Sequence, residues 1–71
     1  MINRNLLEAK IKENGMNVEK LASILEISKV TLYRKLKGDS HFYKNEILKI
    51  SKVLNLEISI MELIFFPELV T

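Results

Sequence analysis

Residues 21–38 read LASILEISKVTLYRKLKG, and the spacing of their apolar residues predicts two short helices joined by a tight turn. Leu21, Ala22 and Leu25 fall on one face of the first helix. We expect this helix to begin after Asn17, because an asparagine side chain can accept a hydrogen bond from a free amide of the first turn. The apolar face predicts that the helix packs onto a core.

The second helix of the pair follows a turn at residues 26–27. Ser28 is expected to cap its start, because a serine hydroxyl satisfies an amide that has no partner within the helix. Leu32 and Leu36 lie four positions apart and are expected to face inward. Gly38 is expected to end the helix, because glycine enters the left-handed conformation at little cost.

The second helix is basic, and its cationic residues are Lys29, Arg34, Lys35 and Lys37, with no acidic residue among them. A helix pair of this kind is typical of a helix-turn-helix, in which one helix lies across the DNA backbone and the next enters a groove. The alternative is that these side chains form only the solvated face of a surface helix.

Charge is unevenly distributed along the chain, although the net charge is only +2. Residues 1–27 contain four basic and four acidic residues, whereas residues 28–52 contain seven basic and two acidic ones. Residues 53–71 contain three acidic residues and no basic one. A basic middle and an acidic end suggest one face for a polyanion and another face for a different contact.

Helices are also predicted on both sides of the pair. Residues 4–14 are expected to form a first helix, which the glycine at position 15 helps to end. Residues 44–54 are expected to form a fourth helix, with Phe42 packing inward ahead of it and Asn55 as a left-handed stop. One core is expected, and it contains Leu21, Leu32, Leu36, Ile47, Ile50 and Leu54.

Enzyme chemistry finds little support in the sequence. His41 is the one histidine, and its neighbours Asp39 and Ser40 do not define a triad, which depends on spatial geometry. There is no cysteine, and the two glycines lie 23 positions apart, so neither a thiolate metal site nor a phosphate-binding glycine loop is expected. No apolar run approaches the roughly 18 residues of a membrane span, and no signal peptide is visible. We therefore expect a non-enzymatic protein of the bacterial cytoplasm without cofactor, metal, membrane or small-molecule substrate.

The ordered motif L-A-x(5)-S-x-x-T-L-x-R-x-L-x-G over residues 21–38 resembles the lambda-repressor-like helix-turn-helix of the Cro/CI (XRE-type) family of phage regulators. The continuation H-F-Y-K-N-E-I-x-x-I-x-x-V-L-N-L is similar to the fourth helix of small members from temperate phages of Gram-positive bacteria. The resemblance covers roughly residues 4–66. It implies an all-α, five-helix domain that binds a double-stranded DNA operator and regulates transcription in a lysis–lysogeny switch.

The fifth helix is expected between residues 57 and 66, and Pro67 ends it. Its start is open by two residues, because Ser59 with Glu62 fits a capping box whereas the family frame begins nearer Glu57. The residues after Pro67 are expected to form a tail. The chain is therefore interpreted as one domain over residues 1–71, with the helix-turn-helix at about 18–37 and the C-terminal helix and tail at about 57–71.

The resemblance also implies which residues contact DNA. Lys29, Val30 and Arg34 would face the major groove, where a cation can bind guanine and an apolar side chain can contact the thymine methyl. The residues implied near the phosphates are Ser28, Thr31, Lys35, Lys37, Tyr43, Lys44 and Asn45, and Tyr33 completes the DNA-facing set. For Val30 and Tyr33, packing within the protein is the alternative.

The sequence departs from the family pattern in two places. Many relatives have glutamine at the first residue of the second helix, where it contacts a phosphate, whereas this chain has Val18. Because a valine side chain cannot form that hydrogen bond, weaker operator binding is expected. Relatives often bury an arginine–glutamate pair where this chain has Ile11 and Leu36, an exchange that need not cost stability.

The C-terminal end is very apolar, and we expect Phe65, Phe66, Leu69 and Val70 to form an interface. Relatives use the fifth helix for dimers, so a homodimer is one expectation. A heterologous partner is the other, because small Cro-like modulators of repression engage the opposing CI repressor. In that alternative the protein is an antirepressor that binds the CI repressor, through this end or through the basic helix, and alters its operator binding.

Overall fold

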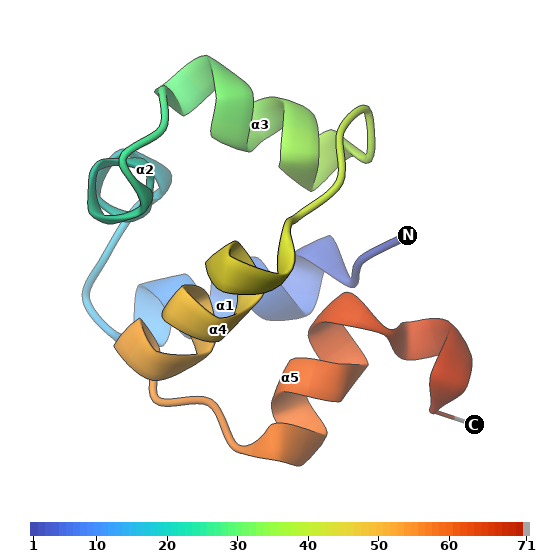
Figure 1. The fold of residues 1–71 in the computed structure, drawn as a ribbon. Coiled ribbons are helices and arrows are strands. Elements are labelled where there is room, and N and C mark those ends of the chain that lie inside the picture. The colour runs from blue at the N-terminus through green and yellow to red at the C-terminus, as the bar shows by residue number, and fades with distance from the viewer. Residues whose placement is uncertain (71) are drawn as a thin grey trace.

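The computed structural model describes residues 1–70, which form five α-helices and a short final turn of 3-10 helix (Figure 1). The elements are α1 (Arg4–Glu13), α2 (Val18–Leu25), α3 (Lys29–Lys37), α4 (Lys44–Val53), α5 (Ile58–Phe65) and η1 (Pro67–Leu69). In Figure 1, α3 lies at the top of the view and α5 at the bottom, with α1 and α4 between them. The all-α, five-helix prediction is confirmed.

The predicted caps define both helices of the central pair. The Asn17 side chain accepts a hydrogen bond from the Lys20 amide at 2.8 Å, and the Ser28 hydroxyl accepts one from the Thr31 amide at 3.0 Å. Gly38 ends α3 with φ 90°, a conformation that a side chain would strain. The start of α2 and both ends of α3 therefore follow directly from local sequence.

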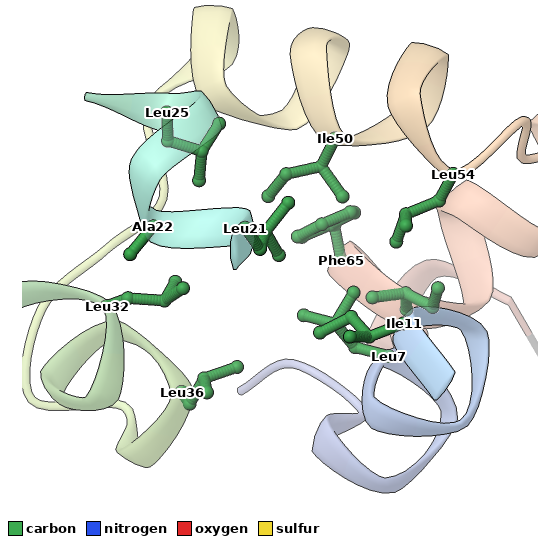
Figure 2. Packing of buried hydrophobic residues seen from close by; sticks show 11 residues of the cluster. Leu7, Ile11, Leu21, Ala22, Leu25, Leu32, Leu36, Ile50, Leu54 and Phe65 are labelled. Carbon is green, nitrogen blue, oxygen red and sulfur yellow. The ribbon is translucent and has the colours of Figure 1, made fainter. Parts of the chain in front are cut away.

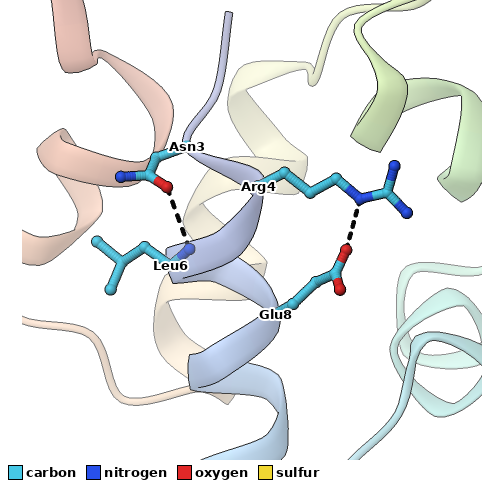
Figure 3. Close-up of polar contacts among 4 residues, drawn as sticks. All are labelled: Asn3, Arg4, Leu6 and Glu8. Atoms are coloured by element: carbon cyan, nitrogen blue, oxygen red, sulfur yellow. Dashed lines mark hydrogen bonds and ion pairs between the residues drawn. The ribbon is translucent and has the colours of Figure 1, made fainter.

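The first helix is capped in the same way (Figure 3). The Asn3 side chain accepts a hydrogen bond from the Leu6 amide at 3.1 Å, and the Arg4 guanidinium pairs with Glu8 one turn further along the helix. The Asn3 amide donates to the Ile64 carbonyl at 2.7 Å, which joins the N-terminal residues to α5.

In the C-terminal region, the structure decides between the two starts predicted for α5 and corrects the prediction of a tail. Helix α5 begins after Glu57, as the family frame predicts, and the capping box at Ser59 is wrong. Asn55 adopts φ 53°, as predicted. The segment predicted as a tail instead contains η1, and Glu68 pairs with the Met1 amino group at 2.7 Å. The hydrogen bond from that amino group lowers the pKa of Glu68 below its usual value. Thr71 lies outside the described residues.

One apolar core joins all five helices, and its members are Leu7, Ile11, Leu21, Ala22, Leu25, Leu32, Leu36, Ile50, Leu54, Ile64 and Phe65. Figure 2 shows Leu32 and Leu36 projecting from α3 toward this core. Of the six core residues predicted from sequence, only Ile47 is not fully buried, and it packs against the edge of the cluster. Ile11 and Leu36, the apolar replacements for an ion pair in relatives, are both buried.

A buried ion pair connects α3 to α4. The Lys35 ammonium lies 3.1 Å from a Glu46 carboxylate oxygen, and the two side chains are only 3% and 8% exposed. The same ammonium donates to the His41 carbonyl at 2.8 Å, while Glu46 accepts a hydrogen bond from the Tyr43 amide at 2.7 Å. The pair therefore holds both ends of the loop between α3 and α4.

Phe42 also anchors this loop, as predicted. Its ring packs edge-on against Phe65, with the ring centroids 5.3 Å apart.

Within residues 1–70, no helix has the length and apolarity that crossing a membrane requires.

We predict that Leu32→Ala lowers the free energy of unfolding by roughly 2–5 kcal/mol, because it leaves a cavity beneath α3. The measurement is a urea titration followed by circular dichroism. Val30→Ala, at an exposed position of the same helix, is the control and should change stability little. A midpoint for Leu32→Ala that matches wild type would contradict the packing described for α3.

Glu46→Gln is predicted to lower the free energy of unfolding by about 3 kcal/mol or more, because it leaves the Lys35 ammonium buried without a counter-charge. The double variant Lys35→Met with Glu46→Leu should recover most of that loss, since apolar residues of similar volume often replace a buried ion pair without cost. Equal loss in the single and double variants would show that the ion pair is not the source of the effect.

Candidate nucleic-acid interface

The outer face of α3 presents most of the α3 side chains that the sequence assigned to DNA. Lys29, Val30, Tyr33, Arg34 and Lys37 are all exposed. Val30 is 60% exposed although it is apolar, so the alternative in which it packs inside the protein is wrong. Tyr33 also lies at the surface. The helix therefore carries cations, an aromatic ring and one short apolar side chain on a single accessible face.

The start of α3 is held by a small hydroxyl cluster. The Ser28 hydroxyl accepts a hydrogen bond from the Thr31 amide and donates to the Thr31 hydroxyl at 2.8 Å. Ser28 is exposed and Thr31 is half-buried. These contacts fix the first turn of the helix, so the backbone that carries Lys29 and Val30 is positioned before any ligand binds.

Two of the α3 cations have acidic neighbours. The Lys29 ammonium lies 3.7 Å from a Glu19 carboxylate oxygen, and the Lys37 ammonium lies 3.6 Å from an Asp39 oxygen. Arg34 has no carboxylate within ion-pair distance among residues 1–70. Among the exposed cations of α3, an incoming anion therefore competes with a carboxylate of residues 1–70 at Lys29 and Lys37 but not at Arg34.

The structure corrects the prediction for Lys35, which was expected over the DNA backbone. Its ammonium is buried against Glu46 and lies 4.4 Å from the centre of the Tyr43 ring. A contact with phosphate would require this group to leave its counter-charge and the core. Lys35 is therefore a structural residue that locks α3 onto α4.

The start of α4 adds a second group of exposed side chains beside α3, namely those of Tyr43, Lys44 and Asn45. The Tyr43 amide already donates to Glu46, so it is not available to a phosphate. The amides of the first helical turn have no partners within the helix and carry the positive end of its dipole. Lys44 and the amides around Asn45 thus give this region positive potential.

The first residue of α2 shows the consequence of the departure from the family pattern. Val18 is half-buried and packs against the core, and its side chain cannot form the hydrogen bond to phosphate that glutamine forms in relatives. It lines a surface hollow of about 510 Å³ together with Met16, Glu19 and Tyr33. The neighbouring exposed side chain at the start of α2 is the acidic Glu19.

The C-terminal interface predicted from sequence is only partly present. Phe65 is 7% exposed and belongs to the core, so its assignment to an interface is wrong: it faces inward from α5 and packs on Phe42. Phe66, Leu69 and Val70 are exposed, Leu69 by 80%. Phe66 also lines an apolar hollow of about 470 Å³, with Phe42, Lys44, Ile47, Leu48 and Met61 as the other lining residues.

The sequence did not predict three features of these surfaces. Glu46 is the partner of the buried Lys35, and Glu19 pairs with Lys29. Leu48 is 56% exposed although it is apolar. Across residues 1–70, no three His, Cys, Asp or Glu side chains gather as a metal ion would require.

Comparison with known proteins agrees with this geometry. A family model described as the Cro/C1-type HTH DNA-binding domain matches residues 7–65, which include α2, α3, α4 and α5 in full. No curated protein and no solved structure matches the chain. The match spans most of the chain and includes the capped helix pair with its exposed basic face. The chain therefore belongs to the Cro/C1-type family of helix-turn-helix DNA-binding domains.

Proposed function

We propose that the protein is a sequence-specific transcriptional regulator that places α3 in the major groove of a DNA operator. The observation that carries this proposal is the rigidly capped α3, whose outer face presents Lys29, Val30, Tyr33, Arg34 and Lys37 to solvent. Arg34 is assigned to a base, because its guanidinium can donate two hydrogen bonds to guanine. Val30 is assigned to a thymine methyl group.

Phosphate contacts are assigned to the two ends of this surface. Lys37 at the end of α3 and Lys44 at the start of α4 supply cations, while Ser28 and Asn45 supply polar groups. Such contacts set the orientation of a protein on DNA but carry no sequence information. A regulator of this kind acts in the cytoplasm, and we propose a dimer, because paired half-sites are the usual target of this motif.

The finer role that we propose is regulation of a phage lysis–lysogeny switch. It rests on the resemblance of roughly residues 4–66 to small Cro-like proteins of temperate phages.

A second candidate function is an antirepressor that binds a CI-type repressor protein. Two observations favour it: the Val18 side chain cannot hydrogen-bond a phosphate, and an apolar hollow lies beside Phe66. Exposed apolar surfaces of this kind mark protein contacts. In this alternative, Phe66, Leu69 and Val70 form the contact with the partner, or α3 itself does.

Arg34→Ala is predicted to weaken operator binding by about 1–3 kcal/mol while changing binding to random DNA much less, because it removes a base contact. Lys37→Ala is the matched control, and it should weaken both sequences alike because it removes a phosphate contact. Binding is measured by gel shift on the promoter region next to the gene. An unchanged operator-to-random ratio for Arg34→Ala would show that Arg34 does not read a base.

Phe66→Asp is predicted to abolish binding to a purified cognate repressor if the apolar hollow is the contact, because it buries an unpaired charge. Ile58→Asp, at an exposed apolar position outside the hollow, is the control and should bind as wild type does. Titration calorimetry without DNA measures both. Absence of any complex for wild type at tens of micromolar, a binding free energy of roughly −6 kcal/mol or weaker, would rule out the antirepressor function.

A further inference from the structure

One ion pair joins the two helices of the helix-turn-helix across its DNA-facing side. Glu19 lies in the first turn of α2, and its carboxylate oxygen is 3.7 Å from the Lys29 ammonium in the first turn of α3. The two side chains are 67% and 53% exposed. Within residues 1–70 it is the one ion pair between these two helices.

The position of this pair gives it an effect that an ordinary surface pair lacks. When α3 enters a major groove, the helix ahead of it lies across the backbone, so the start of α2 also faces phosphates. A carboxylate there repels the phosphates and also occupies Lys29, whose ammonium beside the start of α2 is assigned here to a phosphate and not to the base contact that the resemblance implies. The pair is exposed and therefore weak, so DNA can compete for Lys29 but must first replace Glu19.

We propose that Glu19 acts as an internal competitor for DNA phosphate, which holds Lys29 and so lowers affinity for DNA of any sequence. Val18 offers no side-chain hydrogen bond to phosphate at this end of α2. When sequence-independent binding to phosphates is weakened, the base contacts of α3 supply a larger share of the affinity, so the operator is better distinguished from random DNA. This inference rests on the proposed DNA-binding function.

The test is Glu19→Gln, which keeps the size of the side chain and removes its charge. Glu13→Gln is the matched control, because it causes the same change in net charge and also breaks an exposed pair, between Glu13 and Lys10 at 3.2 Å on α1. Each variant is titrated with a fluorescent duplex of random sequence, and anisotropy is read at several salt concentrations between about 50 and 200 mM.

Glu19→Gln is expected to bind random DNA up to about eightfold more tightly at 0.1 M salt, because Lys29 is released to neutralise one further phosphate. For the same reason, the log–log dependence of affinity on salt should become steeper by about 0.9. Glu13→Gln should show a clearly smaller gain and an unchanged slope.

A second background shows whether Glu19 acts through Lys29. When Lys29→Met is already present, adding Glu19→Gln should no longer steepen the salt dependence. A full effect in that background, or equal behaviour of Glu19→Gln and Glu13→Gln, would overturn the inference while leaving the DNA-binding function intact. A wild-type protein that binds no DNA at low salt would overturn both.

Discussion

The buried ion pair between Lys35 and Glu46 is the contact on which the arrangement of the outer surface depends. It joins the last turn of α3 to the first turn of α4, and its hydrogen bonds to His41 and Tyr43 hold the intervening loop. Two charges so completely removed from water are stable only when each satisfies the other. This buried electrostatic contact, together with the packing of Phe42 on Phe65, therefore positions the start of α4 beside α3.

Because this ion pair buries Lys35, not every basic residue of α3 contributes to its outer surface. Its basic residues form two groups with opposite roles, since Lys35 faces inward and serves the fold while Lys29, Arg34 and Lys37 face outward. The outward cations are not equivalent either. Lys29 and Lys37 each have a carboxylate neighbour, whereas Arg34 has none among the residues that the structure describes. The positive surface is therefore narrower than the composition of the helix suggests.

The surface around α5 depends on which apolar side chains are buried, and not on an ion pair. Phe65 and Phe66 are adjacent in sequence, yet the first lies in the core and the second lines an open hollow. Phe65 is the last residue of α5, whereas Phe66 follows the helix with a non-helical backbone (φ −134°, ψ 51°), so helical periodicity does not set the direction of its side chain. The apolar end of the chain thus divides between internal packing and a surface that is available to a partner, and this division is what keeps a protein-binding role open beside the DNA-binding one.

Local sequence determined the start of α2, both ends of α3 and the resemblance to the family, whereas the start of α5 stayed open until the structure decided it. The caps at Asn17 and Ser28 and the left-handed Gly38 act within a few residues of themselves, so they were predictable without any tertiary contact. The inward direction of Leu32 and Leu36 followed from helical periodicity in the same way. Only the tertiary structure decided the roles of Lys35, Glu19 and Phe65, because each depends on a partner distant in the chain: Glu46, Lys29 and Phe42. The charge or apolarity of a side chain limits which contacts it can form. The neighbour that packing places beside it determines whether it belongs to the core or to the surface.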